Sequence, residues 1–173
     1  MGLVEASLEA PAGLAEFLRE VGDGENGFGG VPEVASGELS IPAYLEREVA
    51  RSQGRDLPQG YVPNTTYWLL GDDRQILGMC RLRHHLNDEL LVHGGHIGYY
   101  IRPGERGKGY GTQLLALVLE AARGLGIQRA LLTVNTANVH SRRLIEANGG
   151  VMQDERSDEN GTPYRRYWID LTS

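Results

Sequence analysis

The sequence predicts a single α/β domain, built as one mixed, twisted β-sheet with helices on both faces. Residues 96–134 read as strand, helix and strand, and such a crossover joins two parallel strands. Residues 65–86 and 151–171 each read as two strands joined by a tight turn, which requires antiparallel pairing. A chain of 173 residues can bury its own core, so we treat 1–173 as one domain.

The N-terminal third is predicted to hold a strand, two helices and glycine-rich loops. Residues 2–8 read as a short strand. Apolar residues recur at helical spacing over 11–21, and a second helix is expected over 42–52, with Ser40 as its cap. Glycines crowd the segment 22–30, which is therefore predicted to be a loop.

The rest of the chain is predicted to supply most of the sheet. Strands are expected over 65–70, 76–86, 96–102, 130–134, 151–156 and 164–171. The helix expected over 114–125 is apolar on nearly every face, which indicates that it is buried. A last helix, over 138–148, begins at Asn138, a favourable N-cap residue, and ends before Gly149 and Gly150.

Composition and charge exclude several classes of protein. Lys and Arg total 17 against 23 Asp and Glu, and the net charge of −6 argues against nucleic-acid binding, which needs a basic surface. The N-terminus lacks the pattern of a secretory signal, and no apolar run reaches the roughly 18 residues of a membrane span. Cys80 is the only cysteine and is expected in the core. We therefore expect no membrane partner and a cytoplasmic location.

The most informative segment is the glycine-rich loop at 102–112, between a predicted strand and the buried helix. Its alternating glycines let the backbone present successive N–H groups at a helix N-terminus, where the helix dipole is positive. Arg106 and Lys108 add positive charge. The loop is therefore predicted to cradle a phosphate or pyrophosphate.

Three phosphate-binding patterns compete for this loop. A P-loop requires Ser or Thr after its lysine, but Gly109 follows Lys108. A Rossmann loop requires Gly-x-Gly-x-x-Gly and an acidic residue about 20 positions later, and neither is present. The third pattern, Arg/Gln-x-x-Gly-x-Gly/Ala, is met by Arg106, Gly109 and Gly111. With this loop the sequence resembles the GNAT superfamily of acyl-CoA-dependent N-acetyltransferases.

The resemblance covers about 65–171 and implies that the loop binds the pyrophosphate of acetyl-CoA, the co-substrate. The cofactor-binding residues that it implies are Tyr99, Tyr100, Ile101, Arg106, Gly107, Lys108, Gly109, Tyr110, Gly111, Thr112, Asn138 and Ser141. In the family, a splayed strand binds pantetheine through its backbone and polarises the thioester, and here 99–101 matches it. Residues 64–173 would then form the cofactor-binding core with the C-terminal hairpin, and 1–63 the helices and acceptor-site loops.

The resemblance leaves the acid and base of the reaction open. Many members carry a tyrosine seven residues after the asparagine that matches Asn138, as the acid that protonates the leaving thiolate, but this chain has Ile145 there. Tyr164 and Tyr167 in the C-terminal hairpin are candidate replacements. His96, at the start of the strand before the loop, is the candidate general base, because an imidazole exchanges protons near neutral pH.

A second candidate base and a possible metal site also need to be considered. Glu89 is the alternative to His96 as the general base. His84, His85, His93 and His96 lie close in sequence, but no cysteine or carboxylate pattern completes a metal site, and we expect none.

The sequence therefore predicts an N-acetyltransferase in which a primary amine attacks acetyl-CoA directly. The acceptor would be a small-molecule or peptide amine, and the acidic residues of 22–37 and 53–63 favour a cationic one. The alternative is a non-catalytic acyl-CoA-binding sensor, suggested by Ile145. A nucleotide-binding module is a third reading, which the glycine spacing disfavours. A homodimer is one of the oligomeric states left open.

Overall fold

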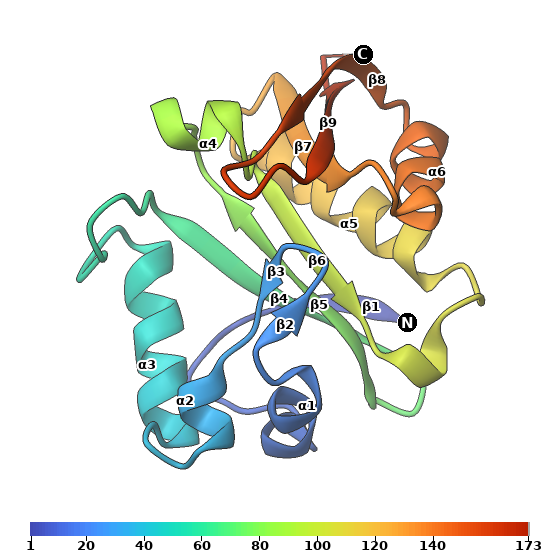
Figure 1. The fold of residues 1–173 in the computed structure, drawn as a ribbon. Helices are drawn as coiled ribbons and strands as arrows, with labels where there is room; N and C mark the ends of the chain where they lie inside the picture. The colour runs from blue at the N-terminus through green and yellow to red at the C-terminus, as the bar shows by residue number, and fades with distance from the viewer. Residues whose placement is uncertain (173) are drawn as a thin grey trace.

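The computed structural model describes residues 1–172, and the architecture is α/β, with helices packed on a central β-sheet (Figure 1). The strands are β1 (Gly2–Glu5), β2 (Gly24–Glu25), β3 (Phe28–Gly29), β4 (Asn64–Leu70), β5 (Ile76–Arg83), β6 (Ile97–Ile101), β7 (Arg129–Asn135), β8 (Val151–Ser157) and β9 (Pro163–Asp170). The helices are α1 (Leu14–Val21), α2 (Pro32–Ala35), α3 (Ile41–Ser52), α4 (Asp88–Val92), α5 (Tyr110–Gly124) and α6 (Val139–Ala147). The predicted fold class is confirmed.

The central sheet is hydrogen-bonded as two antiparallel halves rather than as the one continuous, mixed sheet expected. Within residues 1–172, the parallel ladder expected between the strands at 96–102 and 130–134 is not formed. The first half has the order β1-β4-β5-β6 and the second the order β7-β9-β8. The halves meet only at the start of β6, where Gly95 bridges Leu132 and the His96 N–H donates to the Leu131 carbonyl at 2.7 Å. Beyond this point β6 and β7 separate, so one edge of β6 has no partner strand.

Helices cover both faces of the sheet, as predicted, and each face has its own hydrophobic cluster. Side chains of β4 alternate between them: Leu69 packs with Leu114 of α5, whereas Trp68 packs with Phe17 of α1 and Tyr44 of α3. Cys80 is fully buried in the α5 cluster, as expected, and burial raises the pKa of its thiol.

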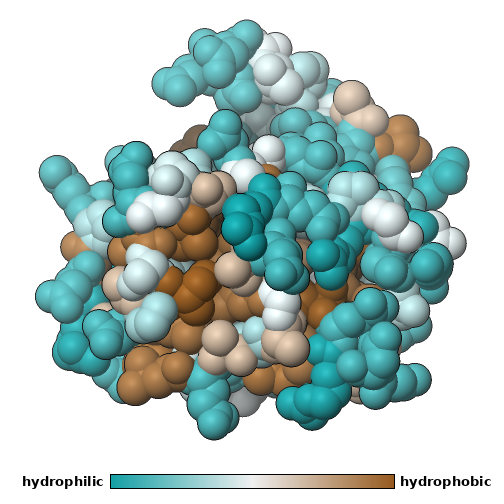
Figure 2. Space-filling view, turned by 90° about the horizontal axis from the view of Figure 1, so that it is seen from below, coloured by the Kyte–Doolittle hydropathy of each residue, from teal (hydrophilic) through white to brown (hydrophobic). Residues whose placement is uncertain are grey.

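Figure 2 shows the molecule from below the view of Figure 1. Hydrophobic residues gather in the middle of this face, and hydrophilic residues surround them. Within residues 1–172, no helix is both long enough and apolar enough to span a bilayer.

Several local predictions hold, and others were wrong at the element boundaries. The Ser40 hydroxyl caps α3 by accepting the Ala43 N–H at 3.2 Å. β5 ends at Arg83, before the predicted Leu86, and α5 begins at Tyr110, four residues earlier than predicted. Helices α2 and α4 were missed because four or five residues are too few to show a helical period.

The segment 22–30, predicted to be a loop, contains the hairpin β2–β3. Two glycines allow the two arms of this hairpin to approach closely. A Cβ atom on Gly24 would lie 1.8 Å from the carbonyl oxygen of Phe28, and one on Gly30 would lie 1.9 Å from that of Gly22. The glycines that predicted a loop therefore allow a hairpin whose close backbone approach leaves no room for a Cβ atom.

Candidate active site

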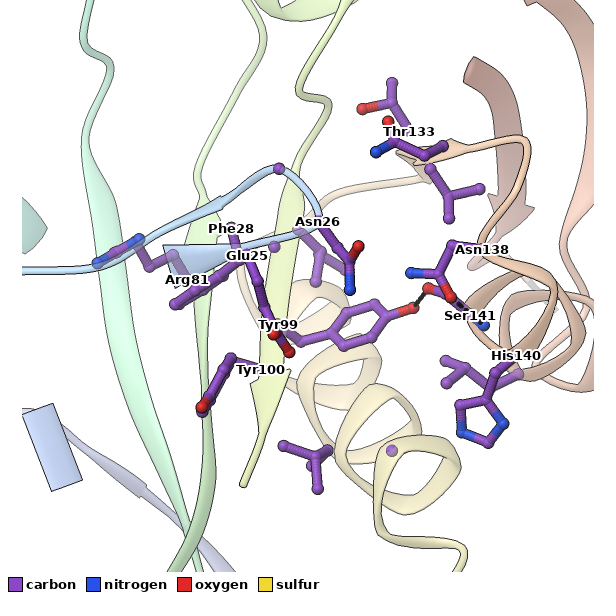
Figure 3. Close-up of a pocket in the computed structure, with 18 of the residues that line it drawn as sticks. Glu25, Asn26, Phe28, Arg81, Tyr99, Tyr100, Thr133, Asn138, His140 and Ser141 are labelled. Carbon is purple, nitrogen blue, oxygen red and sulfur yellow. Dashed lines mark hydrogen bonds between the residues drawn. The ribbon is translucent and has the colours of Figure 1, made fainter. Parts of the chain in front are cut away.

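A cavity of about 600 Å³ lies where β6 separates from β7. The hairpin β2–β3 borders one side, and the first turn of α6 borders the other, with the N-terminus of α5 at one end (Figure 3). Most of the residues assigned from the sequence to cofactor binding line it: Tyr99, Tyr100, Ile101, Arg106, Gly107, Gly109, Tyr110, Gly111, Thr112, Asn138 and Ser141. Lys108 lies outside this set and pairs with Glu105 at 3.0 Å.

The glycine loop presents free backbone donors to the cavity. Among residues 1–172, the backbone N–H groups of 107–112 have no hydrogen-bond acceptor. Gly107 and Gly109 have φ angles of 79° and 85°, a region that favours glycine. A Cβ atom on either would meet open space. This row of N–H groups at the N-terminus of α5 fits a pyrophosphate.

Arg106 fixes the loop to its surroundings. Its Nε donates to the Ile101 carbonyl at 2.9 Å, at the end of β6, and its Nη2 pairs with Glu25 of the β2–β3 hairpin. The guanidinium group also lies over the ring of Tyr100, 5.4 Å from its centroid. One arginine therefore connects the loop, the strand and the hairpin that border the cavity.

The unpaired edge of β6 faces the cavity. The Arg83 N–H bonds to the His96 carbonyl, and the Arg102 N–H bonds to the Leu77 carbonyl. Because antiparallel hydrogen bonding alternates along a strand, these two bonds direct Gly98 toward β5 and the N–H and C=O of Tyr99 toward the gap. The backbone of Tyr99 can thus hold a ligand that runs between β6 and β7.

The side chain of Tyr99 crosses the cavity to α6. Its hydroxyl makes a hydrogen bond with Ser141 Oγ, beside Asn138 (Figure 3). Asn138 caps α6, as predicted, by accepting the Ser141 N–H at 3.2 Å. Burial raises the pKa of Tyr99 to about 12, so this phenol keeps its proton at neutral pH.

His96 lies outside the cavity, at the junction of the two half-sheets. It is buried, and its Nδ1 accepts the Leu131 N–H at 2.9 Å. Burial, with smaller effects of Arg83 and His85, lowers its pKa to about 4. The His96 imidazole therefore makes a structural hydrogen bond between the two half-sheets. The imidazoles that line the cavity are those of His93 and His140.

The two tyrosines of β9 also lie away from the cavity lining. Tyr164 donates to the Val92 carbonyl at 2.9 Å, and Tyr167 donates to Glu146 Oε1 at 3.0 Å. Both rings are buried, as is Ile145, in the position of the usual tyrosine. Glu89 is exposed on α4 and does not line the cavity.

The histidines that lie close in sequence make separate contacts in the structure. His84 bonds to the hydroxyl of Thr65 at 2.8 Å, and His93 stacks on Tyr164 with ring centroids 4.2 Å apart. In residues 1–172, no three His, Cys, Asp or Glu side chains come together as a metal site.

Sequence reasoning missed two cavity residues that carry charge, Arg81 and Arg83 on β5. A signal for them existed. Two arginines at alternate positions of an otherwise apolar strand face the same side of a sheet, and burying charge there requires a reason.

Comparison with known proteins agrees with this geometry. Residues 38–149 match the model of the acetyltransferase (GNAT) family. The chain belongs to this family. It is accordingly an acetyltransferase, and the family uses acetyl-CoA. No curated protein matches the chain significantly.

Solved GNAT structures share the fold at low sequence identity. A spermidine N-acetyltransferase SpeG chimera from Vibrio cholerae and hSSAT has a TM-score of 0.69 at 15% identity, covering 99% of this chain and 98% of its own. A GNAT acetyltransferase from Streptococcus pneumoniae has 0.66 at 20%, covering 98% of each chain. yncA, a putative acetyltransferase from Salmonella typhimurium with acetyl-CoA, has 0.66 at 15%, covering 99% and 94%.

The glycine cradle can be tested with Gly109→Ala. The new methyl group would enter the open space that a pyrophosphate needs, so we expect acetyl-CoA affinity to fall by at least about 10-fold in calorimetry. The positive φ also adds strain of about 1 kcal/mol.

Gly126→Ala is the matched control. Gly126 has a φ of 83° and open space around its Cβ position, but it follows α5 at the end remote from the cavity. The two variants should lose similar thermal stability, and only Gly109→Ala should lose affinity. Equal acetyl-CoA affinities in the two variants would contradict the assignment of the glycine loop as the pyrophosphate site.

The position of His96 predicts a pH-dependent stability. Its pKa is about 4 in the folded protein against 6.5 for a free imidazole, so between these values the unfolded chain binds a proton that the folded chain does not. The stabilisation is complete above pH 6.5 and is lost as the pH falls towards 4, by up to about 3 kcal/mol. Urea unfolding at several pH values should show a flatter dependence for His96→Gln.

His140→Gln, which removes an exposed imidazole, is the control for the loss of a histidine side chain. The pH profile of kcat/KM should keep its shape in His96→Gln, because His96 does not line the cavity. An inflection that disappears in this variant would instead support a role for His96 as the base.

Proposed function

We propose that this chain transfers the acetyl group of acetyl-CoA to a primary amine that attacks the thioester directly. The observation that carries the proposal is that the anion cradle and the unpaired edge of β6 open into one cavity. A CoA molecule held by its pyrophosphate at 107–112 can extend its pantetheine arm along this edge. The acceptor then enters from the side of the β2–β3 hairpin.

The chain's own groups can supply most of what the reaction needs. The Tyr99 N–H faces the gap and can stabilise the negative charge that develops on the carbonyl oxygen. Asn138, with its amide at the start of α6, can hold the pantetheine arm. The amine nitrogen bonds to the carbonyl carbon, the carbon–sulfur bond breaks, and the electron pair goes to sulfur. The amine loses its extra proton to a base or to solvent.

Tyr99 is the group best placed to protonate the leaving thiolate. Its phenol lies in the cavity and stays protonated, and Ser141 orients it. Tyr164 and Tyr167 point their hydroxyls at other partners. We therefore assign to Tyr99 the role of the tyrosine that Ile145 replaces.

The proposal as a whole is tested by a panel of primary amines with acetyl-CoA, following thiol release and the acetylated amine by mass spectrometry. The proposed function requires release that depends on an amine. The sensor alternative predicts tight acetyl-CoA binding without release for any amine. ATP or NAD affinity in place of acetyl-CoA affinity would support a nucleotide-binding module.

The acid role predicts that Tyr99→Phe lowers kcat by about 100-fold, because a positioned acid contributes about that much. Acetyl-CoA affinity should stay nearly unchanged, since the Tyr99 backbone remains. Steady-state kinetics and calorimetry separate the two effects.

Tyr167→Phe is the control for Tyr99→Phe. It also removes one buried phenol hydroxyl, the one bonded to Glu146, and should cost about 1 kcal/mol of stability with kcat unchanged. If kcat falls in Tyr164→Phe or Tyr167→Phe but not in Tyr99→Phe, the assignment of the acid to Tyr99 is wrong.

A further inference from the structure

We infer that the acceptor end of the cavity binds an anionic group, so that the amine acetylated here also carries a carboxylate, as an amino acid does. The inference rests on the proposed function and specifies its substrate class. It is carried by two arginines that line the cavity, Arg81 beside the β2–β3 hairpin and Arg83 beside Gly94 and Gly95.

The fold holds both arginines in fixed positions. Arg81 donates to the Gly29 carbonyl and lies over the ring of Phe28, 4.6 Å from its centroid. Arg83 donates through Nη1 to the carbonyls of Gly94 and Gly95, at 3.2 and 3.0 Å. These contacts use few of the five N–H donors on each guanidinium group, so donors remain for a ligand.

Neither arginine has a counter-ion within residues 1–172, where no carboxylate lies within 4.0 Å of Arg81 or Arg83. By contrast, Arg47, Arg102 and Arg106 each pair with a glutamate. Burial lowers the pKa of Arg83, and the charge of Arg81 lowers it further. Two like charges are thus held close together, partly out of water, and an anion would relieve their repulsion.

The carboxylates of the cavity do not balance this charge. Glu25 is paired with Arg106, and Glu105 with Lys108. The cavity lining holds three arginines, Arg81, Arg83 and Arg106, against these two carboxylates. The acidic loops that favoured a cationic acceptor place only Glu25 in the cavity. The charge of the acceptor end therefore fits an anion better than a polyamine.

The two arginines lie close to the proposed reaction centre. Arg81 is directly opposite Gly98 in the β5–β6 ladder, next to Tyr99. Neighbouring strands are about 4.8 Å apart. The ring of Phe28 lies over Gly98, 3.5 Å from where its Cβ would be, and packs against Arg81. A carboxylate bound to the free donors of the Arg81 guanidinium group would hold an amine only a few bonds away, near β6. Figure 3 shows Arg81 and Phe28 on the opposite side of Tyr99 from Asn138 and Ser141.

The experiment compares pairs of acceptors that differ only in charge. The standard L-amino acids, their α-amides and spermidine are each tested with acetyl-CoA. A guanidinium–carboxylate contact contributes about 10- to 100-fold, so the best amino acid should exceed its amide in kcat/KM by that factor. It should also exceed spermidine.

Arg81→Gln should abolish the preference for the acid over its amide by raising KM for the acid. Arg81→Lys should restore part of the preference, because a lysine keeps the charge without the fork. Arg19→Gln, on the exposed surface of α1, removes the same charge outside the cavity and should leave the preference intact.

Arg83→Gln also breaks two backbone contacts, so its thermal stability must be measured alongside its activity. If the Arg83→Gln variant does not fold, Arg81→Gln alone carries the test. Acetylation of spermidine in preference to every amino acid would overturn the inference and leave the proposed function intact. So would an acid-over-amide preference that survives Arg81→Gln. If no amine in the panel supports thiol release, the proposed function itself is overturned.

Discussion

The separation of β6 from β7 is the feature on which the site depends. Backbone donors and acceptors inside a sheet are normally paired, and an unpaired edge buried in protein costs free energy unless a ligand satisfies it. Here the Tyr99 edge lies open to the cavity, and the N–H row of 107–112 continues the same lining. The fold therefore leaves its unsatisfied polar groups where a cofactor can use them.

The separation begins at a junction that the structure fixes with specific contacts. The His96 N–H donates to the Leu131 carbonyl, and its Nδ1 accepts the Leu131 N–H, so one residue satisfies both groups of its neighbour on β7. Gly95 supports this contact, because a Cβ atom there would lie 2.3 Å from the Leu131 carbonyl oxygen. His96 thus holds the two half-sheets together where they diverge, and accepting the Leu131 N–H requires its neutral form.

Sequence reasoning found what depends on local pattern and missed what depends on tertiary placement. The glycine loop, the Asn138 cap and the burial of α5 follow from spacing along the chain, although α5 begins four residues earlier than predicted and Lys108 lies outside the cavity lining. Residue type alone could not show that His96 turns its ring into the sheet junction while Tyr99 turns its phenol into the cavity. The split of the sheet was also hidden, because the strand pattern is the same whether or not two strands pair.

The charges around the cavity differ between its two ends, in line with the proposed function. At the cofactor end, free N–H groups supply partial positive charge, and the nearby side-chain charges of Arg106 and Lys108 are paired with glutamates. At the proposed acceptor end, no carboxylate among residues 1–172 lies within 4.0 Å of Arg81 or Arg83. A backbone cradle binds a phosphate without a fixed counter-charge to displace, whereas unpaired guanidinium groups attract any anion small enough to enter. The order of binding should matter for this reason: with CoA in place, its phosphates occupy the cradle, and the arginines remain for the acceptor.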